Sequence, residues 1–248
     1  MMPARKQTMT YAEYFAFEEK AVERHEFLNG EVFAMGGGTI EHAGLIAGVS
    51  IALGAALRDR PCRIFSSELR IRIRATGLTT YPDVSVVCGK AEADAEDPHA
   101  IVNPTLVVEV LSDSTEAYDR GEKAAHYRHL PSLREYVLVS QHRPRIEVYR
   151  RNDAGRWELY EHESGSQVEL ASVRCSIAVD EVYRDPLAAA GRLAGTGWVA
   201  ARRSVPGHPR TPLDLSRDTH HRRDPAQIGA LPHRHGGCDA ARPEVWLP

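Results

Sequence analysis

The chain has 248 residues, an apolar fraction of 42% and a formal net charge of −3, which together indicate a folded globular protein. The acidic balance excludes a uniformly basic, polyanion-binding surface and leaves room only for a local basic patch. The longest apolar stretch, residues 43–57, is too short to span a bilayer, and the N-terminus lacks the apolar core of a signal peptide. We therefore expect a cytoplasmic protein with no membrane partner.

The chain opens with helical and hairpin signals. Thr10 is a plausible helix N-cap, and Glu13 three residues later completes a capping-box pattern. Asn29 and Gly30 lie between two short apolar runs, which is the strongest local signal for a β-hairpin because both turn positions need positive φ. The stretch "IEHAGLIAGVSIALGAALRDR" then has apolar residues at helical spacing, with small residues for close packing.

The middle of the chain alternates between strand and helix patterns. "RIFSSELRIRIRATG" is expected to be a strand that places Ile71 and Ile73 on one face and Arg70, Arg72 and Arg74 on the other, exposed face. "TTYPDVSVVCG" and "PTLVVEVLS" predict two further strands, and "STEAYDRGEKAAHYRHL" predicts a helix capped by Ser114 or Thr115. Three more strands follow, joined by turns at 142–144 and 152–155. This order predicts an α/β domain with a mixed sheet flanked by helices.

The composition changes near residue 187. Residues 188–248 are rich in Arg, Pro and Gly and have no sustained period, so we expect a domain at 8–187 followed by a tail of low order. The tail's arginines outnumber its acids, but a solvated extension is favoured over nucleic-acid binding. The tail motif "HRHGGC" is discounted as a metal site. Because Cys62, Cys88, Cys175 and Cys238 are irregularly spaced, free thiols are the simplest interpretation.

Two carboxylates on apolar strands carry the chemistry. Glu109 interrupts the run "LVVEVL", where an ionised carboxylate is costly unless it is paired, protonated or bound to metal. Asp83 follows Pro82 at the start of the preceding strand. If the two strands pair side by side, their carboxylates converge on one point and offer the hard oxygen ligands that Mg²⁺ needs.

These blocks resemble a known family. A Pro-Asp strand followed by an apolar-Glu strand is similar to the PD-(D/E)xK superfamily. More closely, "RHEFLNGEVFAMGGGTIEH", "YPDVSVVCG", "VVEVLSDSTEAYDRGEKAAHYRHLPSLREYVLV" and "VYRRNDAGRWELY" resemble the Uma2 family of endonucleases, in order and with similar spacing from about Thr10 to about Asp185. The resemblance implies a restriction endonuclease-like core, a Mg²⁺ or Mn²⁺ cofactor bound by Asp83 and Glu109, and hydrolysis of DNA phosphodiester bonds.

The chain departs from the superfamily at the catalytic lysine. The superfamily has Lys two residues after the second acid, where this sequence has Leu111. Lys123 is the next candidate, since Asp119, Lys123 and Tyr127 share one face of the following helix, an arrangement that Uma2 members also show. Lys123 would orient the attacking water or stabilise developing charge. An i, i+4 salt bridge from Lys123 to Asp119 is an equally weighted alternative.

The resemblance also indicates additional site candidates upstream. Uma2 members carry acids at the positions of Glu26 and Glu31 and a His at the position of His42. One of the two acids is expected to join the metal site, although exposed hairpin acids are the default. A helix-start histidine such as His42 is more often structural.

Three readings of function remain. The leading one is a Mg²⁺-dependent DNA endonuclease with Asp83, Glu109 and Lys123 as catalytic residues, and superfamily members suggest a homodimer formed through a sheet edge or the hairpin at 27–35. The second is an inactive nuclease-fold module that binds nucleic acid or a protein partner, as the missing lysine at Leu111 allows. The third is a structural domain in which Glu109 pairs with Arg70 or Arg72.

Overall fold

The structure is a computed structural model, and it describes residues 8–185. The predicted tail at 188–248, with Cys238 and the "HRHGGC" motif, lies outside the described residues, so the boundary of the tail stays a prediction. None of the helices within residues 8–185 is both long and apolar enough to cross a membrane.

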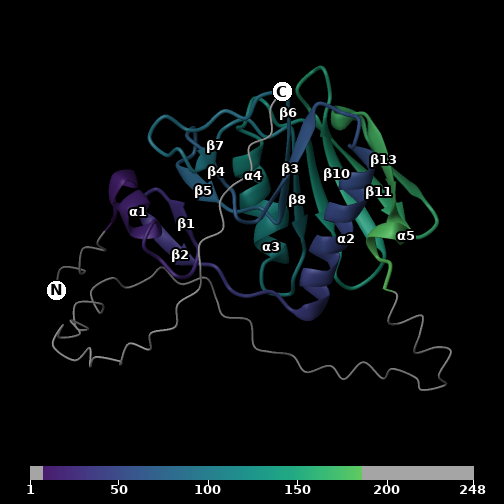
Figure 1. Cartoon of the computed structure of the whole chain (residues 1–248), viewed down its shortest axis with the longest axis horizontal. Helices are drawn as coiled ribbons and strands as arrows, with labels where there is room; N and C mark the ends of the chain where they lie inside the picture. Colours follow the sequence, from purple (N-terminus) through teal and green to yellow (C-terminus); the bar gives the residue numbers. More distant parts are fainter. Residues whose placement is uncertain (1–7, 186–248) are drawn as a thin grey trace, which may run out of the picture. The chain divides into compact units, whose positions relative to one another are not determined.

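Two larger sheets and one two-stranded sheet organise the described part of the chain (Figure 1). The main sheet has six strands, in the spatial order β11 (Trp157–Glu163), β10 (Arg145–Arg151), β9 (Glu135–Val139), β8 (Leu106–Val110), β6 (Val84–Cys88) and β3 (Cys62–Ser66). The small sheet has five strands, in the order β2 (Glu31–Ala34), β1 (His25–Leu28), β5 (Leu78–Thr80), β4 (Arg70–Ile73) and β7 (Ala100–Ile101). The pair β8–β9 is parallel whereas the other pairs of the main sheet are antiparallel, so the predicted mixed sheet is confirmed.

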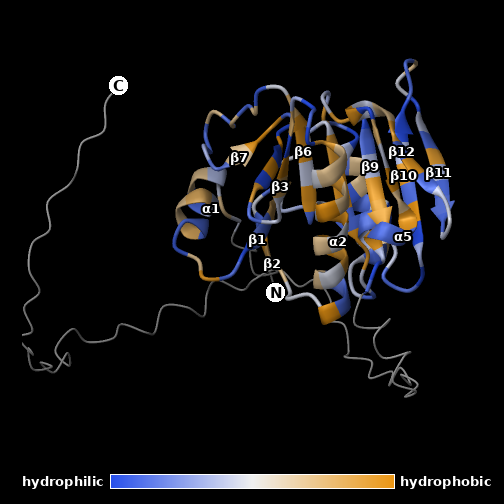
Figure 2. Ribbon diagram, turned by 45° about the vertical axis from the view of Figure 1, so that its right-hand side comes forward, coloured by the Kyte–Doolittle hydropathy of each residue, from blue (hydrophilic) through white to orange (hydrophobic). Residues whose placement is uncertain are grey.

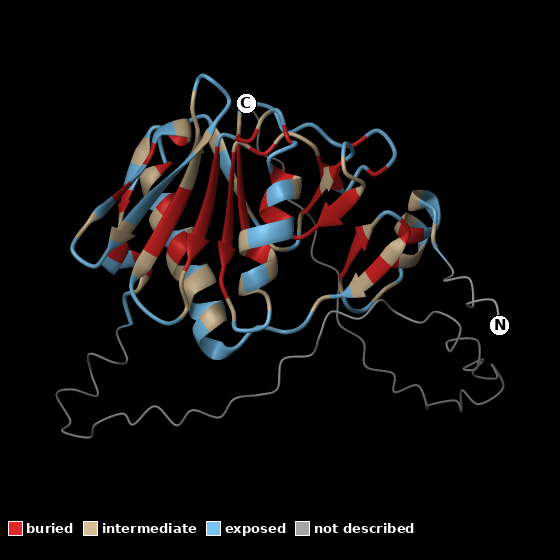
Figure 3. Cartoon of the chain, turned by 180° about the vertical axis from the view of Figure 1, so that it is seen from behind, coloured by how far each residue is buried: buried red, intermediate tan, exposed pale blue. Residues whose placement is uncertain are grey.

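The main sheet has helices on both faces. On one face, α2 (Ile40–Ala56) and α5 (Val179–Val182) pack with the two-stranded sheet of β12 (Gln167–Leu170) and β13 (Cys175–Ala178). A short 3₁₀ turn, Ala171–Val173, joins those two strands. On the other face, α4 (Ala124–Tyr127) and strands of the small sheet pack against β8 and β9. The central strands are therefore buried along their length, as Figure 3 shows in red.

The N-terminal signals in the sequence are confirmed. α1 (Tyr11–Glu18) begins at Thr10, whose side chain and that of Glu13 form the capping box. Asn29 and Gly30 both have positive φ, at 48° and 96°, and join β1 to β2 as a hairpin. Tyr14, Phe27 and Val32 form a small core that packs α1 onto this hairpin.

Two predicted strands are each divided between the sheets. The stretch expected to be one strand before Gly77 forms β3 in the main sheet and β4 in the small sheet. The next predicted strand breaks around Pro82, giving β5 in the small sheet and β6 in the main sheet. Proline has no backbone N–H and so ends a ladder, which is the physical reason for the second break.

The expectation of free thiols is wrong for two of the four cysteines. Cys62 on β3 lies directly opposite Cys88 on β6, and the two form a disulfide across 26 residues of chain. Sequence spacing alone does not reveal this register pair. Cys175 is a free thiol.

Candidate active site

Asp83 and Glu109 meet at the junction of β6 and β8. The register pairs Val84 with Val108, so the next residues outward, Asp83 and Glu109, are neighbours. The Asp83 backbone N–H donates to Glu109 Oε2 at 3.3 Å, and the Val110 N–H donates to Asp83 Oδ2 at 2.7 Å. The predicted side-by-side pairing of these strands is confirmed, and it fixes both carboxylates at one point.

Lys123 points into this junction. Its side chain is 5% exposed, and Nζ lies 2.8 Å from Glu109 Oε1. The same ammonium lies 3.5 Å from Glu26 Oε1 and 3.6 Å from Asp119 Oδ1. The contact with Glu109 is shorter than the i, i+4 contact with Asp119. Lys123 therefore does not serve only as the partner of Asp119 in a salt bridge within the helix.

The helix that carries Lys123 is irregular. Instead of the single predicted helix, α3 (Glu116–Tyr118), a π-helical turn (Asp119–Lys123) and α4 follow one another. Thr115 is the N-cap residue, but its side chain makes no capping hydrogen bond. Single π-turns inside helices occur frequently at functional sites. Here the turn contributes Asp119 and Lys123, both buried, to the carboxylate junction.

Tyr127 holds Glu109 from the same helix. Its hydroxyl is buried and donates to Glu109 Oε1 at 2.9 Å. The spacing of four residues from Lys123 was visible in the sequence, but nothing there indicated that the tyrosine hydroxyl reaches Glu109. Tyr136 adds a second anchor, because its hydroxyl donates to the Asp119 carbonyl at 2.9 Å.

The upstream candidates occupy different places. Glu26, on β1, is 2% exposed; it contacts Lys123 and accepts a hydrogen bond from the Thr80 hydroxyl at 2.5 Å. Glu31 lies opposite Leu28 beside the hairpin turn and is half-buried. His42, in the first turn of α2, places Nε2 3.4 Å from Asp83 Oδ1. Of the two acids, Glu26 is the one that enters the junction around Lys123.

Acidic groups outnumber basic groups at this junction. Burial raises the pKa of Glu109 to about 8, with the neighbouring Asp119 and Asp83 adding to the effect against the attraction of Lys123. Burial also raises the pKa of Asp119. Although burial alone would lower it, the pKa of Lys123 is raised well above its ordinary value by Glu109, Glu26 and Asp119. Lys123 therefore keeps its positive charge, whereas Glu109 takes up a proton below about pH 8.

The arginines of β4, Arg70 and Arg72, are not exposed, which corrects the prediction for these two; Arg74, just after β4, is exposed as predicted. Arg70 is 3% exposed and pairs with Asp97 at 2.9 Å and Glu19 at 3.1 Å. Arg72 and Arg74 pair with Asp94. Arg70 and Arg72 therefore pair with other acids and not with Glu109. The hypothesis of a structural domain in which one of them pairs with Glu109 loses its support.

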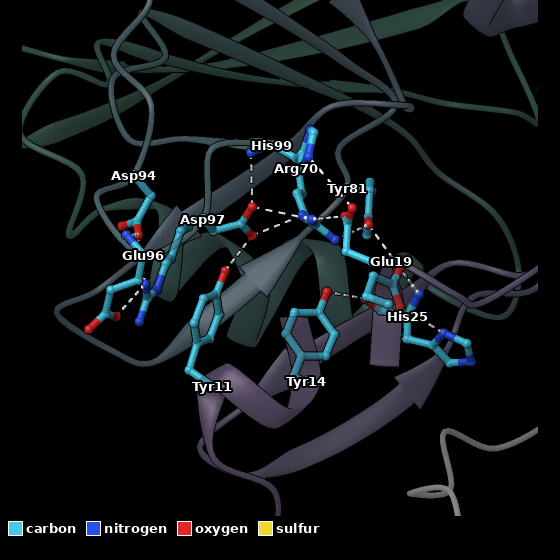
Figure 4. A network of polar contacts seen from close by, with 12 residues as sticks. Tyr11, Tyr14, Glu19, His25, Arg70, Tyr81, Asp94, Glu96, Asp97 and His99 are labelled. Atoms are coloured by element: carbon cyan, nitrogen blue, oxygen red, sulfur yellow. Dashed lines mark hydrogen bonds and ion pairs between the residues drawn. The ribbon is translucent and has the colours of Figure 1, made fainter. Parts of the chain in front are cut away.

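The Arg70 network anchors α1 and the hairpin to β4 and β5 (Figure 4). Tyr81 accepts a hydrogen bond from Arg70 and donates one to Glu18, whose other oxygen lies 2.9 Å from His25 Nδ1. Successive residues of a strand point to opposite faces, so His25 faces this network while Glu26 faces Lys123. The network thus fixes the strand that delivers Glu26.

Comparisons with known proteins identify the family of the chain. The Uma2 family model, described as "Putative restriction endonuclease", matches residues 11–180. "Uncharacterized protein slr1290" of Synechocystis sp. is 42% identical over 172 residues, covering 69% of this chain and 90% of that protein. "Uncharacterized protein sll1609" of the same organism is 35% identical over 161 residues, covering 65% of this chain and 91% of that protein.

A solved structure shares the fold. It is described as a "putative nuclease belonging to DUF820 from Anabaena variabilis ATCC 29413" and superposes with a TM-score of 0.56 at 16% identity. The match covers 71% of this chain and 97% of that one. The fold is therefore restriction endonuclease-like, and the family model together with the relatives shows that the chain belongs to the Uma2 family.

Proposed function

We propose that the protein is a Mg²⁺- or Mn²⁺-dependent endonuclease that hydrolyses DNA phosphodiester bonds. The observation that carries the proposal is the 2.8 Å contact between Lys123 Nζ and Glu109 Oε1, at the point where Glu109 also contacts Asp83. Membership of a restriction endonuclease-like family supports the same reaction class.

Asp83 and Glu109 would hold the metal. Both present carboxylate oxygens, which are the hard donors that Mg²⁺ and Mn²⁺ prefer. The Asp83 side chain is 16% exposed, so the junction is reachable from solvent although Glu109 is buried. No set of three or more His, Cys, Asp and Glu in the described part of the chain is arranged to hold a metal unaided. Two carboxylates are nevertheless sufficient for Mg²⁺, which usually keeps waters and takes substrate phosphates as its other ligands.

Lys123 would take the place of the lysine missing at position 111. Leu111 belongs to the apolar cluster beneath the small sheet and α4, so that position supplies no charge. Residues 109 and 111 share a strand face, and the helix with Lys123 packs on it. An ammonium delivered from that helix therefore reaches Glu109 from the side on which the usual lysine would stand.

The chain's own residues would then divide the work. A bound divalent cation supplies Lewis-acid activation of water and neutralises charge on the phosphate. Lys123, held charged by its carboxylate neighbours, orients the attacking water or stabilises the charge that develops on the phosphate oxygens. Tyr127 keeps Glu109 in place through its hydroxyl. His42 is close enough to Asp83 Oδ1 to steady that carboxylate.

The proposal includes a cytoplasmic location and DNA as partner. The disulfide between Cys62 and Cys88 removes the free-thiol argument for the cytoplasm, because disulfides are rare there. The proposed location therefore rests on the proposed DNA substrate alone.

Cleavage of supercoiled plasmid tests the function. Wild type with Mg²⁺ or Mn²⁺ should nick the plasmid, and Asp83→Asn, Glu109→Gln and Lys123→Met should each lower the rate by about 100-fold or more. Lys90→Ala, at an exposed lysine, should cleave normally. Glu135→Gln removes a buried acid paired with Arg150 at 2.7 Å, so it controls for a loss of stability without a loss of chemistry.

The opposite outcome is equally informative. If clean wild type leaves several DNA substrates intact while still binding Mn²⁺, the endonuclease proposal is wrong and an inactive binding module becomes the better account.

A further inference from the structure

The helix α2 is apolar on all sides. Its inner face buries Val49 and Leu53 against the main sheet. Glu41 is the only acidic residue among its 17 residues, and it contains no lysine or arginine. A helix without a charged face is normally buried all round. Figure 2 shows this apolar character along α2.

The outer face of α2 is nevertheless exposed. Ile40 and Ile51 are 88% and 72% exposed, which is unusual for large aliphatic side chains. We call this surface the α2 face, and it consists of Ile40, Ala43, Gly44, Ala47, Ile51 and Ala55. A mostly apolar groove of about 440 Å³ continues it, between Ile51 and Ala55 on α2 and Ile177 and Ala178 on β13, with Ser176 and Glu181 as its polar lining residues. Large exposed apolar patches of this kind mark interaction sites.

The charges at the two ends of α2 indicate which partner fits. Glu41 lies in the first turn and Arg58 follows the last turn, and both are exposed. Neither residue forms an ion pair with another residue of the described chain. They are separated by about 25 Å, the length of a 17-residue helix, so they cannot pair with each other within one copy.

A second copy of the chain would cover the exposed α2 face and would also provide partners for Glu41 and Arg58. If two α2 helices pack antiparallel about a two-fold axis, the α2 face covers itself and Glu41 of each copy approaches Arg58 of the other. The small residues Ala43, Gly44 and Ala47 would let the helices approach closely, and antiparallel helix dipoles attract. We propose that the α2 face is the interface of a homodimer with this antiparallel arrangement.

This places the dimer contact away from the regions that the sequence suggested. The hairpin of β1 and β2 is already hydrogen-bonded to β5 through β1 and packed beneath α1. The inference stands whether or not the protein cleaves DNA. If the proposed function also holds, the helix at the interface is the one that brings His42 to Asp83, so the assembly would hold two such sites.

The test is the oligomeric state of the full-length chain, measured by sedimentation velocity at micromolar concentrations. Wild type should have twice the mass of the 27.5 kDa chain. Ile51→Glu should be monomeric. Leu159→Glu changes a 47% exposed side chain on β11, away from α2, and should stay dimeric.

Charge reversal identifies the arrangement itself. Glu41→Arg and Arg58→Glu should each weaken the dimer by about tenfold, because each places like charges together twice. The double variant restores opposite charges only across two copies, and its dissociation constant should return to near that of wild type. The four substituted residues, Glu41, Ile51, Arg58 and Leu159, are all exposed, so circular dichroism should show that the variants are folded.

Three results would overturn the proposal. The first is a wild type that stays monomeric. If Ile51→Glu also lowered the stability of that monomer, another segment of the same chain would be covering the α2 face. The second is a dimer that Ile51→Glu leaves intact. The third is a double variant no tighter than the single variants, which would exclude the antiparallel pairing.

Discussion

Glu109 lies in the middle of an apolar strand, and its contacts explain how the fold tolerates it. One carboxylate oxygen accepts from the Tyr127 hydroxyl and contacts the Lys123 ammonium, and the other accepts from the Asp83 backbone. A buried charge is costly unless it is paired and hydrogen-bonded. These partners offset part of that cost, and the pKa of about 8 shows that burial still favours the protonated acid.

The sequence predicted part of this constellation. Asp83 and Glu109 were predictable because consecutive apolar strands commonly pair, and Lys123 because helical spacing gave it a defined face. The Thr80 hydroxyl that holds Glu26 was not predictable. Glu26 and Thr80 are 54 residues apart in the sequence and come together through the pairing of β1 with β5. Local sequence patterns carry no information on such distant strand pairing.

The raised pKa of Glu109 predicts a pH dependence of metal affinity. With a pKa of about 8, the carboxyl keeps its proton at lower pH, and a metal ion must displace that proton to bind. Affinity for Mn²⁺ should therefore rise by about tenfold per pH unit between about pH 6 and about pH 8, then level off. Calorimetric titrations at several pH values measure this. A flat profile for wild type, or the same slope in Glu109→Gln, would contradict it.

Short elements were predicted best where one residue dictates the backbone. The capping box at Thr10 and the Asn-Gly turn are examples, since each requires a particular local conformation. The breaks that divide the predicted strands between two sheets were missed, because the short interruptions at 66–68 and at Pro82 do not reveal that the chain passes from one sheet to another. The π-turn at Asp119–Lys123 was also missed, since the four-residue spacing of Asp119, Lys123 and Tyr127 is that of a regular α-helix.

The hairpin turn can be tested at Gly30. At φ +96°, a Cβ there would meet the Thr8 side chain at 2.8 Å, whereas Gly155, at φ +76°, has nothing within 4 Å. Gly155→Ala should therefore cost about 1 kcal/mol from backbone strain alone. Gly30→Ala should cost about 1 kcal/mol more because of the clash. Urea unfolding compares the two variants, and equal losses would show that the turn tolerates the added methyl group.

For the whole molecule, composition and element order predicted the α/β class but not the covalent link. Cys62 and Cys88 become neighbours only because β3 pairs with β6 in one register, and a shift by one residue would separate them. The disulfide joins the edge strand of the main sheet to the strand that begins after Asp83.

This disulfide predicts a measurable stabilisation. Closing a loop across 26 residues should contribute about 3.5 kcal/mol through the entropy of the unfolded chain. The double variant Cys62→Ser, Cys88→Ser should lose about that free energy of unfolding, and reduction of wild type should have a similar effect. Thiol titration of the unfolded protein gives a control: it should detect two more thiols after reduction, and an unchanged count would mean that no disulfide forms.

The most direct test of the central claim is to locate Mn²⁺ in crystals of the protein by its anomalous scattering. Asp83 and Glu109 should bound the strongest peak, with Lys123 beside it, and the peak should disappear in Glu109→Gln crystals. A well-occupied Mn²⁺ elsewhere, with nothing between Asp83 and Glu109, would contradict the assignment of these two carboxylates as the metal site.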